Sequence, residues 1–500
     1  MENKSLKSQL VRYMDAGFPI IYINTFEEDK VDTIISEISS GKEAYEWNET
    51  NGYIDFETKT PLDPPDCTLE KMLDLLKDRD LLDRKIILLK DVAAYLDEPK
   101  IVSKIKGIAR MINQGVDATI MIVSSILVIP KDLEKFITIL EMDYLGTDEI
   151  KTVIRNFIQD NAVSQAVEDG LIEELASAFK GLTEFEIQNL LALSYADDGA
   201  LTKKDLRLIF DQKQQMIKKA GILEMIPLKE TVDDIGGLEN LKEWFIRKAK
   251  VYKNMGKAKK YGVDMPKGVL IAGVPGCGKS LNAKAAANLF EVPLLRLDMG
   301  RLMGKYVGES EGNLRNAIAL AEAISPCVLW IDELEKAFAG IGGSGGGAEV
   351  TTRLFGNFLT WMQEKESPTF VVATANDITH LPPELLRKGR FDEIFYVGLP
   401  NGTEREKIFQ IHIRKRRPQD LKNIEIKELV SKTRGFSGAD IEGVVKDAVE
   451  SAFADDKTNV RIKDILDAIQ NTHSLSEIMK EALDKMSKEY EKRKFKSASK

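Results

Sequence analysis

The loop between Ala272 and Leu281 constrains the fold of this chain more than any other segment. It reads Gly273-Val-Pro-Gly-Cys-Gly-Lys-Ser280, follows the apolar run 269–272 and precedes the helix-forming run 281–290. A glycine loop between a strand and a helix lets backbone N–H groups converge on phosphate oxygens, and the helix N-terminus adds partial positive charge. The sequence therefore predicts an α/β domain that binds the phosphates of a nucleotide.

Two side chains of this loop have expected roles of their own. The Lys279 ammonium is predicted to reach the β and γ phosphates, and the Ser280 hydroxyl is predicted to bind Mg²⁺. Cys277 is expected only to be small, although an anion-binding loop can also lower the pKa of a thiol. The alternative is a glycine-rich turn without a ligand, which the context of strand, loop and helix disfavours. The expected phosphate-binding residues are Gly273, Val274, Pro275, Gly276, Cys277, Gly278, Lys279 and Ser280.

Two later apolar runs end in polar side chains that suit hydrolysis. The run 327–331 is followed by Asp332 and Glu333, and the run 369–375 is followed by Asn376. We expect Asp332 to orient Mg²⁺, Glu333 to act as the general base on water, and Asn376 to help hold that water near the γ-phosphate. The alternative for Asn376 is a cap on the next turn.

Arg387 and Arg390 lie three residues apart in Leu385-Leu-Arg-Lys-Gly-Arg-Phe-Asp392. A guanidinium group can bind phosphate oxygens in a bidentate manner, and such an arginine can be worth ~10³–10⁵ in turnover. The alternative is a surface turn in which Arg390 pairs with Asp392. The sequence alone leaves both interpretations open.

Bulk composition excludes several classes of protein. The 500 residues suggest about three domains. The net charge of −9 disfavours nucleic acid as the default partner. The three cysteines and three histidines have no metal-ligand spacing, so neither a zinc site nor a disulfide framework is expected. No apolar run reaches the ~18 residues of a membrane span, so a reducing, cytosol-like compartment is expected.

The two halves of the chain look alike in plan. Strand-like runs alternate with helical patterns in both, and Asp91 ends a strand as Asp332 does. The segment Gly181–Gln188 echoes Gly435–Glu442. We infer a duplicated module; the alternative is the rhythm that all doubly wound domains share. The segment Ile20–Lys30 has the place in the first half that the phosphate-binding loop has in the second. It contains no glycine and is acidic, so the first half is predicted not to bind nucleotide.

Taken together, these motifs and Gly435-Phe-Ser-Gly-Ala-Asp440 resemble the AAA branch of the AAA+ ATPases from Val232 to about Asn471. The resemblance implies Mg-ATP as cofactor and a ring, usually a hexamer, in which Arg387 and Arg390 act on the ATP of the neighbouring subunit. It also implies an adenine site. The residues that it assigns to that site are Asp234, Ile235, Gly236 and His412.

The full layout is similar to the AAA open-reading-frame family of cyanobacterial and plastid genomes. It implies an α/β fold: a P-loop NTPase AAA+ module, which is a parallel αβα sandwich with a small helical lid, preceded by a degenerate AAA-like half. It would place the chain in the cytoplasm or, if plastid-encoded, in the stroma. From its charge pattern, the tail after His473 is expected to be solvated and frayed. The expected parts are a degenerate αβ domain (1–160), a small helical domain (161–215), a linker (216–231), a large ATPase domain (232–400), a lid (401–473) and a charged helix with a tail (474–500).

Tyr306 and Val307 resemble the pore loop with which related rings grip an extended polypeptide. An aromatic side chain there offers side-chain-tolerant apolar contact, whereas the alternative is that Tyr306 packs in the core. The first functional hypothesis is therefore an ATP-driven protein remodeller resembling an unfoldase. The second is a regulatory or assembly ATPase whose first half recruits a partner, and the third, which the acidic charge disfavours, is a nucleic-acid motor.

Overall fold

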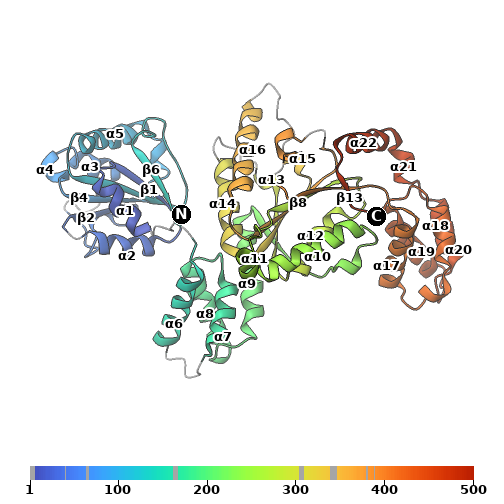
Figure 1. The fold of residues 1–500 in the computed structure, drawn as a ribbon. Coiled ribbons are helices and arrows are strands. Elements are labelled where there is room, and N and C mark those ends of the chain that lie inside the picture. The colour runs from blue at the N-terminus through green and yellow to red at the C-terminus, as the bar shows by residue number, and fades with distance from the viewer. Residues whose placement is uncertain are drawn as a thin grey trace. The chain divides into compact units, whose positions relative to one another are not determined.

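The computed structural model describes residues 6–39, 41–62, 67–142, 144–161, 167–302, 309–337, 346–378, 381–387 and 389–500. The chain forms two compact units, of which the first contains residues 1–145 and 183–189 and the second contains residues 146–182 and 190–500 (Figure 1). Among the described residues, no helix combines the length and the hydrophobicity needed to cross a bilayer.

The first unit is built on a six-stranded sheet with helices on both faces. In spatial order its strands are β3 (Gly52–Asp55), β2 (Glu43–Asn48), β4 (Lys85–Lys90), β5 (Ala118–Ser124), β1 (Ile20–Asn24) and β6 (Ile137–Glu141). Only the β2–β3 pairing is antiparallel. One core lies between the sheet and α3 (Leu69–Leu75) and α5 (Pro99–Asn113), and the other lies under α1 (Leu6–Asp15) and α2 (Glu28–Ile38). The nearly continuous burial of β1, β4 and β5 is typical of parallel strands covered on both faces.

The second unit contains a seven-stranded sheet. In spatial order its strands are β13 (Lys496–Ser497), β12 (Glu393–Val397), β8 (Gly268–Gly273), β11 (Thr369–Ala375), β10 (Cys327–Ile331), β9 (Leu294–Leu297) and β7 (Leu223–Ile226). Every pairing except β7–β9 is parallel. This arrangement confirms the expected α/β fold.

Helices surround this sheet and form the lid. Those that flank the sheet are α10 (Glu239–Lys253), α11 (Met255–Lys260), α12 (Lys279–Phe290), α13 (Met299–Leu302), α14 (Glu309–Ile324), α15 (Leu334–Ala337) and α16 (Gly346–Glu364). The lid consists of α17 (Gly402–Arg416), α18 (Ile426–Lys432), α19 (Gly438–Ala454) and α20 (Ile462–Gln470), which share a separate apolar core. Two further helices, α21 (Leu475–Ile478) and α22 (Lys480–Arg493), follow the lid.

The two sheets share one strand order. The order β6-β1-β5-β4-β2 of the first sheet corresponds to β12-β8-β11-β10-β9 of the second, and each set is parallel throughout. An antiparallel strand follows at the same edge of each set, β3 in one and β7 in the other. This agreement supports the inference that the two halves are copies of one module.

The segment 161–215, expected to be a small helical domain, contains α7 (Asp169–Phe179), α8 (Glu184–Asp198) and the start of α9 (Asp205–Ala220), and Gly181 and Gly199 adopt left-handed backbone angles between these helices. The helix α6 (Thr147–Asp160) precedes them. Part of the expected linker forms β7, since Leu223 and Met225 are buried against β9.

The tail is not frayed, and that expectation is wrong. Residues 496–497 pair with β12, and Ala498 is fully buried. The Ala498 N–H donates to the Tyr396 carbonyl at 2.8 Å, and the Ala498 carbonyl accepts from the N–H groups of Asn240 and Leu241 at 3.0 and 3.2 Å. These N–H groups lie in the first turn of α10, where no helical partner is available, so the tail caps that helix.

Candidate functional site

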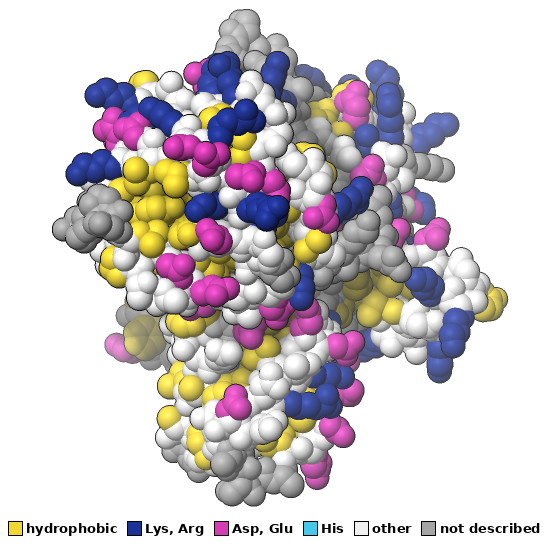
Figure 2. Space-filling model, turned by 90° about the vertical axis from the view of Figure 1, so that its left-hand side faces the viewer, with side chains coloured by type: hydrophobic (Ala, Val, Ile, Leu, Met, Phe, Trp, Pro, Cys, Tyr) yellow, Lys and Arg dark blue, Asp and Glu magenta, His cyan; other side chains and the backbone are white. Residues whose placement is uncertain are grey.

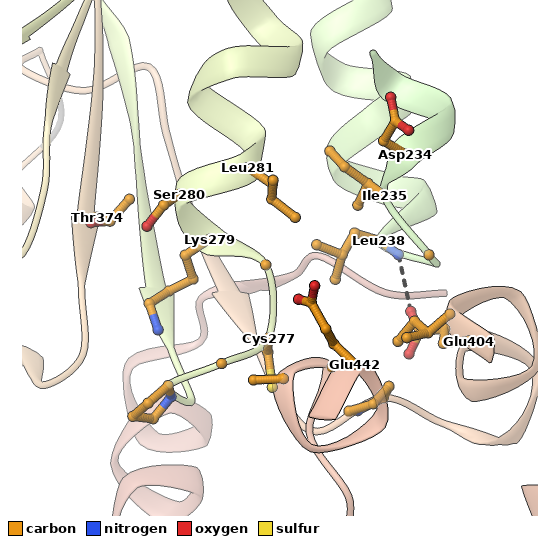
Figure 3. A pocket seen from close by; sticks show the side chains of 18 of the residues that line it. Asp234, Ile235, Leu238, Cys277, Lys279, Ser280, Leu281, Thr374, Glu404 and Glu442 are labelled. Atoms are coloured by element: carbon orange, nitrogen blue, oxygen red, sulfur yellow. Dashed lines mark hydrogen bonds between the residues drawn. The ribbon is translucent and has the colours of Figure 1, made fainter. Parts of the chain in front are cut away.

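The pocket of the second unit lies where the glycine loop, the segment 234–238 and the lid meet (Figure 3). Its volume is about 360 Å³. Most residues assigned to the nucleotide by sequence line it. They are Asp234, Ile235, Gly236, Pro275, Gly276, Cys277, Gly278, Lys279, Ser280, Asp332, Glu333, Asn376 and His412.

The glycine loop has the backbone shape of a phosphate cradle. Gly276 and Gly278 have positive φ values of 71° and 81°. A Cβ on Gly276 would lie 2.9 Å from the Cβ of Ala439 in the lid, so a larger residue would also push the lid away. Helix α12 starts at Lys279. The N–H groups of its first turn, which have no partner within the helix, therefore point toward the loop.

Lys279 is held in place by backbone carbonyls, and no carboxylate of the described residues forms an ion pair with it. Its ammonium donates to the carbonyls of Gly273 and Val274 at 2.9 and 2.8 Å, and its side chain points into the loop (Figure 3). Burial lowers the pKa of Lys279 to about 8. A phosphate would supply the negative charge that this buried cation lacks.

The side chains of Ser280, Asp332 and Thr374 meet next to the glycine loop through their oxygen atoms. The Ser280 hydroxyl donates to Asp332 Oδ1 at 3.1 Å, and the buried Thr374 hydroxyl donates to the same oxygen at 2.6 Å. Ser280 and Asp332 offer hydroxyl and carboxylate oxygens, which are the hard donors that Mg²⁺ prefers. The donor set therefore fits this ion.

Glu333 is fixed by its neighbours in an uncommon backbone conformation. Its φ is 51°, and its N–H donates to the Thr374 hydroxyl at 3.0 Å. Its carboxylate accepts from Asn376 Nδ2 at 3.2 Å and pairs with Lys336 at 2.5 Å. Left-handed backbone at a residue other than glycine costs free energy, so the surrounding contacts must hold it.

Glu335 supports Asn376 from the other side. Its Oε1 accepts from the Asn376 N–H at 3.0 Å. Burial raises the pKa of Glu335, and the charge on Glu333 raises it further. Asn376 is therefore held by two carboxylates, one bonded to its backbone and one to its side chain.

The opposite end of the pocket is mostly apolar. Ile235, Leu238 and Ile408 are buried there. The Asp234 carboxylate accepts hydrogen bonds from the N–H and the hydroxyl of Thr231. Burial lowers the pKa of His412, which keeps the ring neutral near pH 7. Apolar walls of this kind suit a nucleotide base.

The two arginines lie outside this pocket. Arg387 lines a separate cavity together with Lys267 and Phe391. Arg390 donates to the carbonyl of Glu384, whereas Asp392 pairs with Lys248 at 3.2 Å. Each of the two residues thus has another partner, in place of the Arg390–Asp392 ion pair of the surface-turn alternative.

Two other expectations have different outcomes. Tyr306 and Val307 lie outside the described residues. Cys277 does not have a lowered pKa, because burial raises the pKa of its thiol to about 11. Its side chain is buried beside the lid, which agrees with the expectation that this position needs a small residue.

Sequence reasoning missed Thr374, Glu335 and Glu404. Thr374 could have been found, because it lies two residues before Asn376 and alternate residues of a strand face the same side. Glu404 could not have been identified from the sequence, which shows it only as one of several charged residues in a segment typical of an exposed helix. Only the fold brings it to the segment 234–238.

The equivalent edge of the first unit has different chemistry. Lys90, the last residue of β4, pairs with Val123 in β5, and β4 has the place in the first sheet that β10 has in the second. The Lys90 ammonium is buried and lies 2.9 Å from Asp32 and 3.5 Å from Glu46. A buried cation thus ends β4, whereas Asp332 and Glu333 follow β10.

Fold and pocket together define a P-loop ATPase of the AAA class, and comparisons with known proteins agree. The model "ATPase family associated with various cellular activities (AAA)" matches residues 269–399, and the AAA+ lid domain matches residues 423–467. The N-terminal and second domains of SpoVK-like AAA ATPases match residues 6–142 and 148–220.

Similar proteins cover nearly the whole chain. The AAA domain-containing protein ycf46 of Guillardia theta is 38% identical over 93% of this chain and 90% of its own length. The ycf46 protein of Pyropia yezoensis is 37% identical over 89% of each chain. The cell division cycle protein 48 homolog of Archaeoglobus fulgidus is 36% identical over 43% of this chain and 30% of its own length. The chain therefore belongs to the AAA ATPases, and among them to the ycf46 family.

Proposed function

We propose that this protein is a Mg²⁺-dependent ATP hydrolase that forms a ring and uses ATP to remodel a protein partner. One observation supports the hydrolase activity in particular. The same pocket is lined by Lys279, Ser280, Asp332, Glu333 and Asn376. They supply a phosphate-binding cation, two metal-ligand oxygens, a carboxylate for water and an amide to orient it.

In this proposal each side chain has one task. The loop N–H groups and Lys279 bind the phosphates, and Ser280 and Asp332 hold Mg²⁺. When bound, the ion neutralises charge on the phosphate oxygens. Glu333 accepts a hydrogen bond from the attacking water, while Asn376 fixes the direction of the Glu333 carboxylate.

The ring is inferred from the position of the arginines. Arg387 lines a cavity separate from the nucleotide pocket of its own chain, so its guanidinium is a candidate to complete the pocket of a neighbouring subunit. Arg390 is proposed to act beside it. Oligomers are typical of AAA ATPases, and a homo-hexamer is the state we propose.

The remodelling role depends on Tyr306 and Val307, which we propose as the pore residues that grip a polypeptide. A regulatory or assembly ATPase is the second candidate. Changing Tyr306 to Ala distinguishes the two candidate functions. If the protein is a remodeller, the change would abolish remodelling but spare basal hydrolysis and assembly. A nucleic-acid motor has less support, because Lys/Arg and Asp/Glu side chains are interspersed on the face in Figure 2 and the net charge is −9.

Glu333→Gln tests the hydrolase directly. The amide cannot accept the water proton, so ATP should still bind while phosphate release falls by at least ~10²-fold. The measurements are equilibrium nucleotide binding and steady-state release of phosphate. Lys336→Gln, which removes the exposed ion-pair partner of Glu333, serves as the matched control and should lose far less activity. Undiminished turnover in Glu333→Gln would contradict the assignment.

A further inference from the structure

Glu404 is a buried acid at the apolar end of the nucleotide pocket. Its side chain lies on α17 of the lid and is only 6% exposed. Ile235, Leu238 and Ile408 line the same end of the pocket. A buried carboxylate among apolar side chains is costly unless hydrogen bonds satisfy it.

Two backbone N–H groups hold this carboxylate in place. Glu404 Oε1 accepts from the Leu238 N–H at 3.0 Å, shown as the dashed line in Figure 3. Its Oε2 accepts from the Asn401 N–H at 2.9 Å in a capping box. A carboxylate has about four acceptor sites, so these two bonds leave further acceptor capacity.

Close packing prevents Glu404 from turning away. A Cβ on Gly237 would lie 2.4 Å from Glu404 Cγ, and a Cβ on Gly236 would lie 2.4 Å from Ile408 Cγ1. The segment 236–237 is thus pressed directly against the lid. The acid therefore has a fixed position, which recognition of a small group requires.

A fixed acceptor at the base end of a pocket distinguishes the two purine bases. Adenine presents an N–H₂ donor at its 6-position, whereas guanine presents an oxygen acceptor there. A carboxylate attracts the first group and repels the second. Glu442 also lines the pocket, but its carboxylate pairs with Arg416 at 3.0 Å, and His412 is neutral near pH 7.

We propose that Glu404 is a specificity-determining residue that selects ATP over GTP through the 6-position of the base. This inference rests on the proposed ATPase function, because it requires the base to occupy the apolar end of the pocket. It assigns to Glu404 a role in recognition beyond that of capping α17 and holding the segment 236–238.

The test compares equilibrium binding of ATP and GTP to the full chain and to Glu404→Gln. The amide can donate to the guanine oxygen, so the ratio of the GTP Kd to the ATP Kd should fall at least tenfold. Purine riboside triphosphate, which has only hydrogen at the 6-position, provides a third probe. It should bind the wild-type protein more weakly than ATP does, and this difference should shrink in the variant.

Glu442→Gln is the matched control. Glu442 also lines the pocket, but its carboxylate pairs with Arg416 at 3.0 Å, so the ratio should not change in this variant. Thermal unfolding is recorded for each protein. Should Glu404→Gln fail to fold, Glu404→Asp, which keeps the charge and withdraws the oxygens by one CH₂ group, is expected to lower the same ratio.

Each outcome has one meaning. An unchanged ratio in a folded Glu404 variant that still binds ATP would overturn the inference and leave Glu404 as a structural cap. A wild-type protein that binds neither ATP nor GTP would instead contradict the proposed function itself.

Discussion

The Thr374 hydroxyl donates to Asp332 Oδ1 at 2.6 Å and accepts from the Glu333 N–H at 3.0 Å. A single buried oxygen thus links the expected metal ligand to the expected general base. Because Thr374 lies on β11 and the two acids follow β10, this contact sets the position of one strand end against the next.

Thr374→Val should therefore lower turnover with little effect on the fold. The substitution keeps the side-chain shape but leaves the Glu333 N–H without its acceptor and removes one of the two hydroxyl groups that donate to Asp332 Oδ1, so that only Ser280 remains. A lost hydrogen bond to a charged group costs ~1.5–3 kcal/mol, or roughly 10–150-fold in rate. Hydrolysis is measured against Mg²⁺ concentration, and the half-saturating concentration should rise. Thr374→Ser restores the hydroxyl and should recover most of the activity, whereas equal defects in both variants would contradict this role.

ATP binding should weaken as pH rises through about 8. The pKa of Lys279 is lowered to about 8 by burial, so below that pH the side chain carries the charge that attracts phosphate, and above it the charge is lost. The last phosphate proton dissociates near pH ~6, so it does not contribute at higher pH. Calorimetry at pH 8.5 in two buffers of different ionisation enthalpy should show proton uptake on binding. Binding without proton uptake would contradict a neutral Lys279 in the free protein.

One chain should bind one nucleotide. In the first unit the buried Lys90 lies close to Asp32 and Glu46, and the segment 20–30 contains three acidic residues and no glycine. We predict that Lys279→Ala removes all tight ATP binding, measured as the stoichiometry at saturation. Lys90→Met is the counterpart change and should leave the stoichiometry at one. Tight binding that remains in Lys279→Ala would place a second site in the first unit.

Arg387→Ala should bind ATP normally but hydrolyse it ~10³–10⁵-fold more slowly. If the arginine acts on a neighbour, mixing this variant with Glu333→Gln should recover activity. An Arg387→Ala subunit keeps its own Glu333 and can receive Arg387 from a Glu333→Gln neighbour. Phosphate release is measured as the two proteins are titrated together, with each alone as the control. Mixtures no more active than their components would contradict action between subunits.

Local sequence rules predicted what depends on local geometry. The glycine loop and the strands before Asp91, Asp332 and Asn376 lie where the sequence indicated, because strand, loop and helix are encoded by adjacent residues. The nucleotide roles assigned to these residues stay predictions. The edge strands β7 and β13 were missed because four-residue and two-residue strands carry little periodicity of their own and depend on a distant partner.

The contacts that join remote segments could not be predicted. Glu404 meets Leu238 only after the lid folds back over the segment 234–238. Lys90 ends the apolar strand β4, yet its contacts with Asp32 and Glu46 become visible only in the folded unit. Sequence separation hides such pairs, since periodicity describes one element at a time.

The buried tail changes how the lid can move. The lid is joined to the sheet through Pro400 at its start, and after its last helix the chain returns to the sheet through α21, α22 and β13. On that return path Leu475 is bonded to Asp440 at 3.1 Å, and Tyr490 stacks on Tyr396 at 4.2 Å. Because the lid is connected to the sheet at both of its ends, we expect a rotation of the lid to be transmitted to β12. Since β12 begins three residues after Arg390, such a rotation would act on the segment that carries both arginines.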